Sequence, residues 1–132
     1  MIHTRCLAVL DSMWGNPGKA PGLFRINPKN RTGSRLYYLL GHRDLWVTNA
    51  CREQVGSADE HGRPDPEWLA ENLRLITFDL LLVCGKVAQQ TYAKCGFTHT
   101  ARELWFPHPA ARGSWTKEIL ENTRGLIQIG VH

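Results

Sequence analysis

Short apolar runs alternate with helical patterns along this chain. The runs cover residues 6–10, 45–48 and 80–84, and a fourth strand is expected at residues 103–106. A continuous apolar run is typical of a strand that is buried on both faces of a parallel sheet. Helical patterns separate the strands, at residues 34–40, 66–76, 86–94 and 114–124. This alternation predicts an α/β fold, a three-layer α/β/α sandwich with a central four-stranded, mainly parallel sheet.

Two of the expected helices have clear end signals. Asp65 followed by Pro66 is a typical helix start, with Asp65 as the cap and proline in the first turn. This helix is expected to bury Trp68, Leu69, Leu73 and Ile76. Ser114 is expected to cap the last helix, and Gly125 is expected to end it. The inward positions of that helix are expected to be Ile119, Leu120 and Thr123.

The length and composition predict one domain over residues 1–132. The chain is 42% hydrophobic, and its longest apolar runs are far too short to span a membrane. We therefore expect a soluble, intracellular and monomeric protein. The cysteines show no C-x-x-C spacing and are expected to be reduced thiols. Cys84, Cys95, His99 and His108 match the spacing of no common zinc site, so we expect neither a metal nor another cofactor.

The positive charge is concentrated in the first part of the chain. The net charge is +4 in total, and residues 1–52 carry eight Lys or Arg against Asp11 and Asp44, a balance of +6. The remaining residues therefore carry −2. Such an asymmetric field favours a polyanionic partner, although a solvated basic face is the simpler interpretation of charge alone.

Polar groups follow several of the predicted strands. W-G-N-P-G occupies residues 14–18. Pro17 and Gly18 form a stiff turn there that can orient the Asn16 side chain, although an Asn-Pro-Gly sequence more often forms a turn that has no further function. The spacing to Lys19 is too short for a phosphate-binding loop. H-P-A-A-R occupies residues 108–112, and a histidine there can donate a hydrogen bond to a developing anion. Asn49 ends the second strand and offers one donor and one acceptor, enough to read the edge of a nucleobase.

These three segments, in this order, resemble the uracil-DNA glycosylase superfamily. G-N-P-G at residues 15–18 is similar to the G-x-N-P-G motif of its single-strand-selective and mismatch-specific branches, and H-P-A-A-R is similar to the H-P-S-P-R motif. The resemblance implies a monofunctional DNA glycosylase that removes uracil or a related base without a cofactor. The reaction is hydrolysis of the N-glycosidic bond, and the implied partner is DNA, bound through a basic face.

The resemblance also implies roles for individual residues. The catalytic residues would be Asn16, which positions water, and His108, which contacts the leaving base. Substrate would be held by Gly15, Pro17, Gly18, Phe24 and Asn49, with Phe24 stacking on an extruded base. The DNA contacts would be Lys19, Arg31, Arg35, Pro109, Arg112 and Ser114.

The chain departs from the family pattern at several positions. Trp14 stands where the first motif begins with glycine, and Ala110 and Ala111 replace Ser and Pro in the second motif. The two alanines predict weaker DNA binding, and Trp14 argues against a close backbone approach at that position. Asp11 lies early in the strand and is not the expected water-activating acid. Two other hypotheses stay open: a glycosylase-like protein that binds nucleic acid or nucleotides without catalysis, and an N-glycosidase of free nucleotides.

Overall fold

The middle layer of the protein is a parallel β-sheet. The computed structural model describes residues 1–12, 18–19, 22–54 and 62–129. The strands of this sheet are β1 (Ile2–Leu10), β3 (Leu45–Asn49), β5 (Ile76–Cys84) and β6 (Arg102–Phe106). They lie in the order β3-β1-β5-β6, and each pair of neighbours is parallel.

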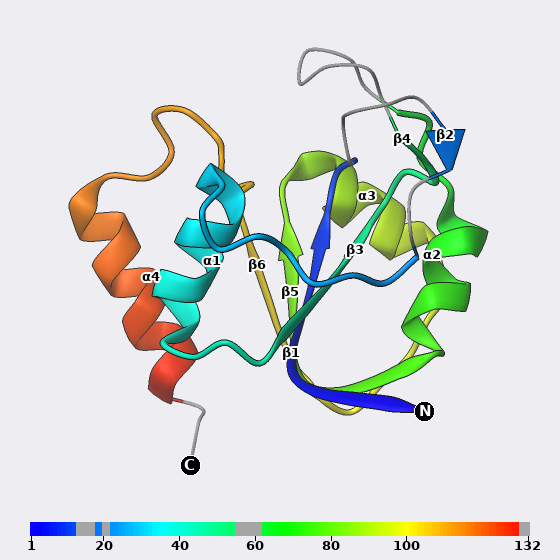
Figure 1. The fold of residues 1–132 in the computed structure, drawn as a ribbon, viewed down its shortest axis with the longest axis horizontal. Helices are drawn as coiled ribbons and strands as arrows, with labels where there is room; N and C mark the ends of the chain where they lie inside the picture. The colour runs from blue at the N-terminus through cyan, green and yellow to red at the C-terminus, as the bar shows by residue number, and fades with distance from the viewer. Residues whose placement is uncertain (13–17, 20–21, 55–61, 130–132) are drawn as a thin grey trace.

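Helices cover both faces of the sheet (Figure 1). One face is covered by α1 (Arg31–Leu40) and α4 (Lys117–Ile129), and the other by α2 (Pro66–Leu73) and α3 (Lys86–Lys94). Side chains of β1 alternate between the two cores, with Ala8 facing α1 and α4 and Val9 facing α2 and α3. The α/β sandwich predicted from the sequence is confirmed. Burial on both faces explains why the central strands occur as continuous apolar runs.

The strands extend beyond the apolar runs that predicted them. β1 begins at Ile2 and β5 at Ile76, and these two residues are parallel partners in the sheet. The predicted strands covered only the continuously buried halves, because exposed polar residues interrupt the first halves of both strands, at His3 and Arg5 in β1 and at Thr77 and Asp79 in β5. A short antiparallel pair, β2 (Gly18–Lys19) with β4 (Glu53–Gln54), was not predicted.

The start of α2 agrees with the sequence, but its end does not. The Asp65 side chain accepts a hydrogen bond from the Trp68 backbone N–H at 3.1 Å, so the predicted cap is confirmed. Leu69 and Leu73 are fully buried, as predicted. Ile76 is not part of the helical face, because the helix ends at Leu73 and Ile76 already belongs to β5.

The last helix begins and ends later than predicted. Ser114 lies in a turn, and Thr116 caps α4 instead, with its hydroxyl oxygen accepting from the Ile119 N–H at 3.2 Å. Trp115 folds back and donates from Nε1 to the His108 carbonyl at 2.8 Å, which holds this segment outside the helix. The predicted stop at Gly125 is wrong, since α4 continues to Ile129.

The inward face of α4 also differs from the prediction. Ile119 is 43% exposed, whereas Ile127 is 1% exposed and belongs to the core beside α1. Leu120 packs against that core, as predicted, and the Thr123 hydroxyl donates to the Ile119 carbonyl at 2.8 Å. The extension of the helix beyond Gly125 therefore supplies its main core contact.

The cysteines are free thiols, as predicted. Cys6, Cys51 and Cys84 are buried, and Cys95 is partly exposed. Burial raises the pKa of the Cys51 thiol to about 12, and the nearby Asp11 carboxylate acts in the same direction. Cys51 is therefore protonated at neutral pH.

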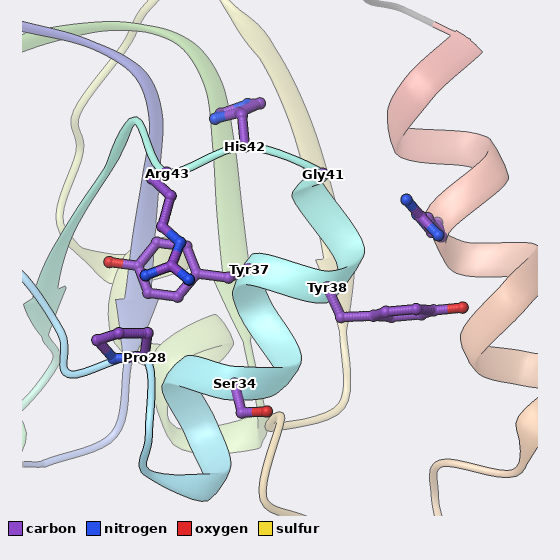
Figure 2. Close-up of a pocket in the computed structure, with 8 residues that line it drawn as sticks. Pro28, Ser34, Tyr37, Tyr38, Gly41, His42 and Arg43 are labelled. Atoms are coloured by element: carbon purple, nitrogen blue, oxygen red, sulfur yellow. The ribbon is translucent and has the colours of Figure 1, made fainter.

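A groove lies on the exposed side of α1, near the end of the helix. Gly41 ends α1 in a left-handed conformation with φ 76°. The groove beside this helix end has a volume of about 400 Å³. Figure 2 shows Tyr38 extending from α1 toward α4 at the groove.

Within the described ranges, no helix is long and apolar enough to cross a membrane.

Candidate functional site

The carboxyl edge of the sheet contains a topological switch point. β1 leads toward α1 on one face, whereas its neighbour β5 leads to α3 on the other. Open α/β sheets bind ligands in the crevice at such a point, because the two connections diverge there. The residues at this edge are Asp11 after β1, Asn49 at the end of β3, Gly85 after β5 and His108 beyond β6. This edge is the candidate site.

His108 is held in a defined orientation and tautomer. Its Nδ1 accepts a hydrogen bond from the Ala110 backbone N–H at 3.0 Å. Since Nδ1 is an acceptor, the neutral ring carries its proton on Nε2. Burial lowers the pKa of His108, and the Asp11 carboxylate opposes this shift. At neutral pH the ring is therefore an uncharged donor through Nε2–H.

Gly85 allows His108 to approach the end of β5. Its φ of 91° and ψ of 163° lie in a region that is essentially restricted to glycine. A Cβ atom at this position would lie 3.1 Å from Cβ of His108. The Gly85 N–H also donates to the Phe106 carbonyl at 2.9 Å, which ties the ends of β5 and β6 together. Glycine is thus required here both by backbone conformation and by space.

Asn49 places a buried amide at the same edge. It is 1% exposed and lies opposite Leu10 in the parallel register. Its Nδ2 has no hydrogen-bond partner among the described residues. A buried donor without a partner costs about 1–3 kcal/mol. An acceptor on a bound ligand would remove this cost, so Asn49 is a candidate ligand-binding group of the site.

Phe24 lies on the same face of the sheet as Asn49. It forms an antiparallel bridge with Val47, in which the two backbone N–H···O distances are 3.0 and 2.9 Å. Residues that pair directly across strands point to the same face, and residues two apart in a strand share a face. Phe24 is half-buried against the core beneath α1. The expected stacking residue and the expected base-reading residue therefore lie on one side of the sheet.

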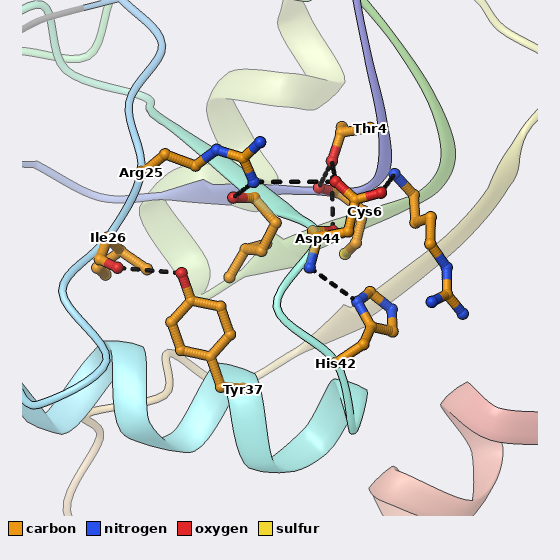
Figure 3. Close-up of polar contacts among 9 residues, drawn as sticks. Thr4, Cys6, Arg25, Ile26, Tyr37, His42 and Asp44 are labelled. Atoms are coloured by element: carbon orange, nitrogen blue, oxygen red, sulfur yellow. Dashed lines mark hydrogen bonds and ion pairs between the residues drawn. The ribbon is translucent and has the colours of Figure 1, made fainter.

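The segment after Phe24 is fastened by side chains from two directions (Figure 3). Arg25 donates from Nη1 to the Leu45 carbonyl at 3.0 Å and forms an ion pair with Asp44 at 3.8 Å. The Tyr37 hydroxyl of α1 donates to the Ile26 carbonyl at 3.0 Å. Phe24 is consequently carried by a braced segment.

Asp11 is a site residue that the sequence interpretation undervalued. It directly follows the last residue of β1, and its Oδ1 accepts from the Ser12 hydroxyl at 3.0 Å. The Cys51 thiol donates to the same oxygen at 3.7 Å. Its carboxylate is also near enough to influence the pKa of His108. The sequence signal was available, because Asp11 ends an apolar run in the same way that Asn49 does.

Most of the first motif cannot be placed. Gly15, Asn16 and Pro17 lie outside the described residues, so the predicted relation between Asn16 and His108 stays a prediction. Gly18 and Lys19 form β2, where Gly18 lies opposite Gln54. Of the G-N-P-G motif, the structure therefore describes only the backbone of its last residue, Gly18.

The predicted DNA-contact residues have different roles in the structure. Arg35 donates from Nη1 to the Pro109 carbonyl at 2.8 Å, and its guanidinium lies 5.8 Å from the centre of the Trp115 ring. These contacts brace the segment that carries His108. Arg31, by contrast, is exposed at the first position of α1, and Arg112 is exposed in the turn before α4.

Comparison with known proteins assigns no family to this chain. No protein-family model matches it, and no curated protein sequence matches it significantly. Within the residues that can be described, no three His, Cys, Asp or Glu side chains are grouped so that they could hold a metal ion.

Proposed function

We propose that this protein is a monofunctional DNA glycosylase that hydrolyses the N-glycosidic bond of uracil or a related damaged or modified base. The observation that carries the proposal is the pairing of two groups at one sheet edge. His108 offers an Nε2–H donor in a neutral ring, and Asn49 offers a buried amide whose Nδ2 has no partner among the described residues. The motif resemblance to the uracil-DNA glycosylase superfamily supports the same assignment.

The positions of these two groups suit a flat base. Asn49 ends β3, and His108 lies against Gly85 at the end of β5, two strand spacings away, so the two positions are separated by about 10 Å. Arg35 of α1 reaches Pro109, so the His108 segment and Asn49 both lie toward the α1 side. An extruded base between them can be hydrogen-bonded from both ends, with Phe24 available for stacking.

Recognition and bond cleavage would then use different residues. The Asn49 amide can donate to and accept from the edge of a pyrimidine. When the N-glycosidic bond breaks, its electron pair moves to the base, and the Nε2–H of His108 stabilises the resulting anion. A neutral donor suits this role, because it stabilises the anion without first having to acquire a proton.

Water completes the reaction at the sugar. Its oxygen bonds to C1′ of the sugar, one of its protons is released, and the departing base gains a proton. In this proposal Asn16 orients the water, by resemblance to the family motif. The Asp11 carboxylate adds negative charge near the positive charge that develops on the sugar.

Base release from labelled oligonucleotides tests this function. Single- and double-stranded substrates would contain uracil, hypoxanthine or hydroxymethyluracil, and alkali-sensitive abasic sites would be measured. The wild type would be compared with Asn16→Ala and His108→Ala. His3→Ala is the matched control, because His3 is exposed at the opposite end of β1. Free nucleotides containing the same bases would be assayed in parallel.

The expected result is base release by the wild type and by His3→Ala, and a loss of about 100- to 1,000-fold in His108→Ala. Release from nucleotides but not from DNA would replace the proposal with a nucleotide N-glycosidase. The glycosylase proposal fails if folded wild-type protein releases none of these bases.

A further inference from the structure

A cationic, aromatic groove lies away from the candidate site, on the outer side of α1. Its lining includes Tyr37, Tyr38, His42, Arg43 and Arg124, and none of its lining residues carries a carboxylate. Its volume of about 400 Å³ is within the range of small-ligand sites. The groove therefore combines positive charge with aromatic surface.

Each tyrosine is paired with an arginine. Arg43 lies over the Tyr37 ring at 5.2 Å from its centre, and Arg124 lies over the Tyr38 ring at 4.7 Å. Tyr38 is 41% exposed, so part of its ring stays accessible. Figure 2 shows Arg43 above Tyr37, while Tyr38 points away from this pair toward α4. Aromatic rings next to guanidinium groups are the usual components of single-strand binding surfaces.

The carboxylate that follows Arg43 in the chain is engaged elsewhere. Asp44 accepts from the Thr4 hydroxyl at 2.9 Å and from the Arg5 backbone N–H at 3.1 Å, and it forms an ion pair with Arg25. His42 accepts from the Asp44 N–H through Nδ1. Among the described residues neither Arg43 nor Arg124 forms an ion pair, so their positive charge is available to a partner of opposite charge.

The groove is continuous with the candidate site along one face of α1. Arg31, Ser34, Tyr38 and Gly41 recur at intervals of three or four residues, which places them on one side of the helix. α1 begins at the carboxyl edge, where Arg35 bonds to Pro109, and runs back from it. The distance from Arg31 to Gly41 is about 15 Å, the axial length of about four stacked nucleotides.

We propose that this groove is a second contact for a single-stranded nucleic acid whose extruded base occupies the carboxyl edge. One base of the flanking strand stacks on Tyr38, and its phosphates lie beside Arg43 and Arg124. The strand follows the exposed face of α1 between the two sites. This inference rests on the proposed function for the position of the extruded base, although the groove contact itself can be measured without catalysis.

Binding of fluorescently labelled single-stranded DNA at several salt concentrations tests the proposal. The wild type would be compared with Tyr38→Ala and Arg43→Ala, using a 15-nucleotide oligomer and a trinucleotide with uracil in the middle. Arg74→Ala is the matched control, because Arg74 is an exposed arginine at the end of α2 on the opposite face. Thermal unfolding would confirm that each variant is folded.

We expect Tyr38→Ala to bind the long oligomer about tenfold more weakly, which corresponds to the loss of one stacked base. Arg43→Ala should reduce the slope of log affinity against log salt by about 0.7, the value for one phosphate contact on a single strand. Trinucleotide binding and the behaviour of Arg74→Ala should be unchanged.

The possible failures can be told apart. If the wild type releases uracil but the groove variants bind the long oligomer like the wild type, the groove proposal is wrong and the proposed function stands. If no base is released but these variants still weaken binding of the long oligomer, the groove contact stands and the proposed function is wrong. Absence of any binding to single-stranded DNA overturns the groove proposal.

Discussion

Replacing Gly85 with alanine should destabilise the protein and displace His108. The backbone at Gly85 has φ 91° and ψ 163°, a conformation that costs other residues about 1–3 kcal/mol. The new Cβ would also lie 3.1 Å from Cβ of His108, which is closer than a normal contact. The Gly85 N–H is bonded to Phe106, so the backbone cannot relax without losing this bond. We therefore expect a loss of about 2–3 kcal/mol in the free energy of unfolding.

Urea unfolding measures this loss, and a second glycine provides a control of opposite sign. Gly125 lies inside α4, and a Cβ there would meet nothing within 4 Å. Gly125→Ala should therefore stabilise the protein by about 0.5–1 kcal/mol, because alanine has less conformational freedom to lose on folding. The urea midpoint should fall for Gly85→Ala and rise for Gly125→Ala.

Base release by the two glycine variants separates positioning from stability. Under conditions in which both variants are folded, Gly85→Ala should release base more slowly, because the shifted His108 no longer aims its Nε2–H correctly. Gly125→Ala should match the wild type. A Gly85→Ala variant that is as stable as the wild type would refute the argument from backbone conformation. Normal base release by a destabilised Gly85→Ala would refute the argument about His108.

Three further substitutions test the cause of the His108 pKa shift and the role of the buried Asn49 amide. Asp11→Asn removes the carboxylate that raises the pKa of His108, so this pKa should fall further below its usual range in an NMR titration of the imidazole; an unchanged pKa would show that the two groups do not interact. Because burial already lowers the pKa of His108, protons bind more readily to the unfolded chain, and stability should fall as the pH drops below about 6.5. Thermal melts across this range should show a weaker dependence in His108→Ala, and an equal dependence would contradict the shift. Asn49→Leu removes a buried donor that has no partner among the described residues. This variant should be at least as stable as the wild type in urea, and base release should be lost. A large destabilisation would mean that the amide has a structural role.

Strands could be predicted from the sequence where consecutive residues are buried. The start of the last helix could not, because an individual hydrogen bond determines it. The run at residues 80–84 predicted a central strand because both of its faces are buried. The four residues before it gave no such signal, yet they pair in the sheet from Ile76 onward. Ser114 has the chemistry of a helix cap, but the bond from Trp115 to the His108 carbonyl keeps it in a turn. A single hydrogen bond between a side chain and the backbone, such as this one, is not visible in a hydrophobic or capping pattern.

The site was predictable only as a set of strand ends. Asn49 and His108 were expected at the carboxyl edge, and the structure brings both to it. Asp11 was set aside because it was expected to lie early in the strand, whereas in the structure it follows the last residue of β1 directly. The resemblance also implied a DNA contact for Arg35, which stays a prediction, but the hydrogen bond from Arg35 to the Pro109 carbonyl was not expected. A side chain's charge can be read from the sequence, but its internal partner cannot.

The internal contacts of the basic residues change the expected mode of DNA binding. Residues 1–52 contain eight Lys or Arg, but Arg25 is bonded to Leu45 and paired with Asp44, and Arg35 is bonded to Pro109. For a single strand, each phosphate contact that is not made lowers the slope of log affinity against log salt by about 0.7. The salt dependence of binding should therefore be smaller than eight cations suggest. Weaker backbone attraction leaves a larger share of discrimination to the groups proposed to contact the base, which in the described part of the site are Asn49 and His108.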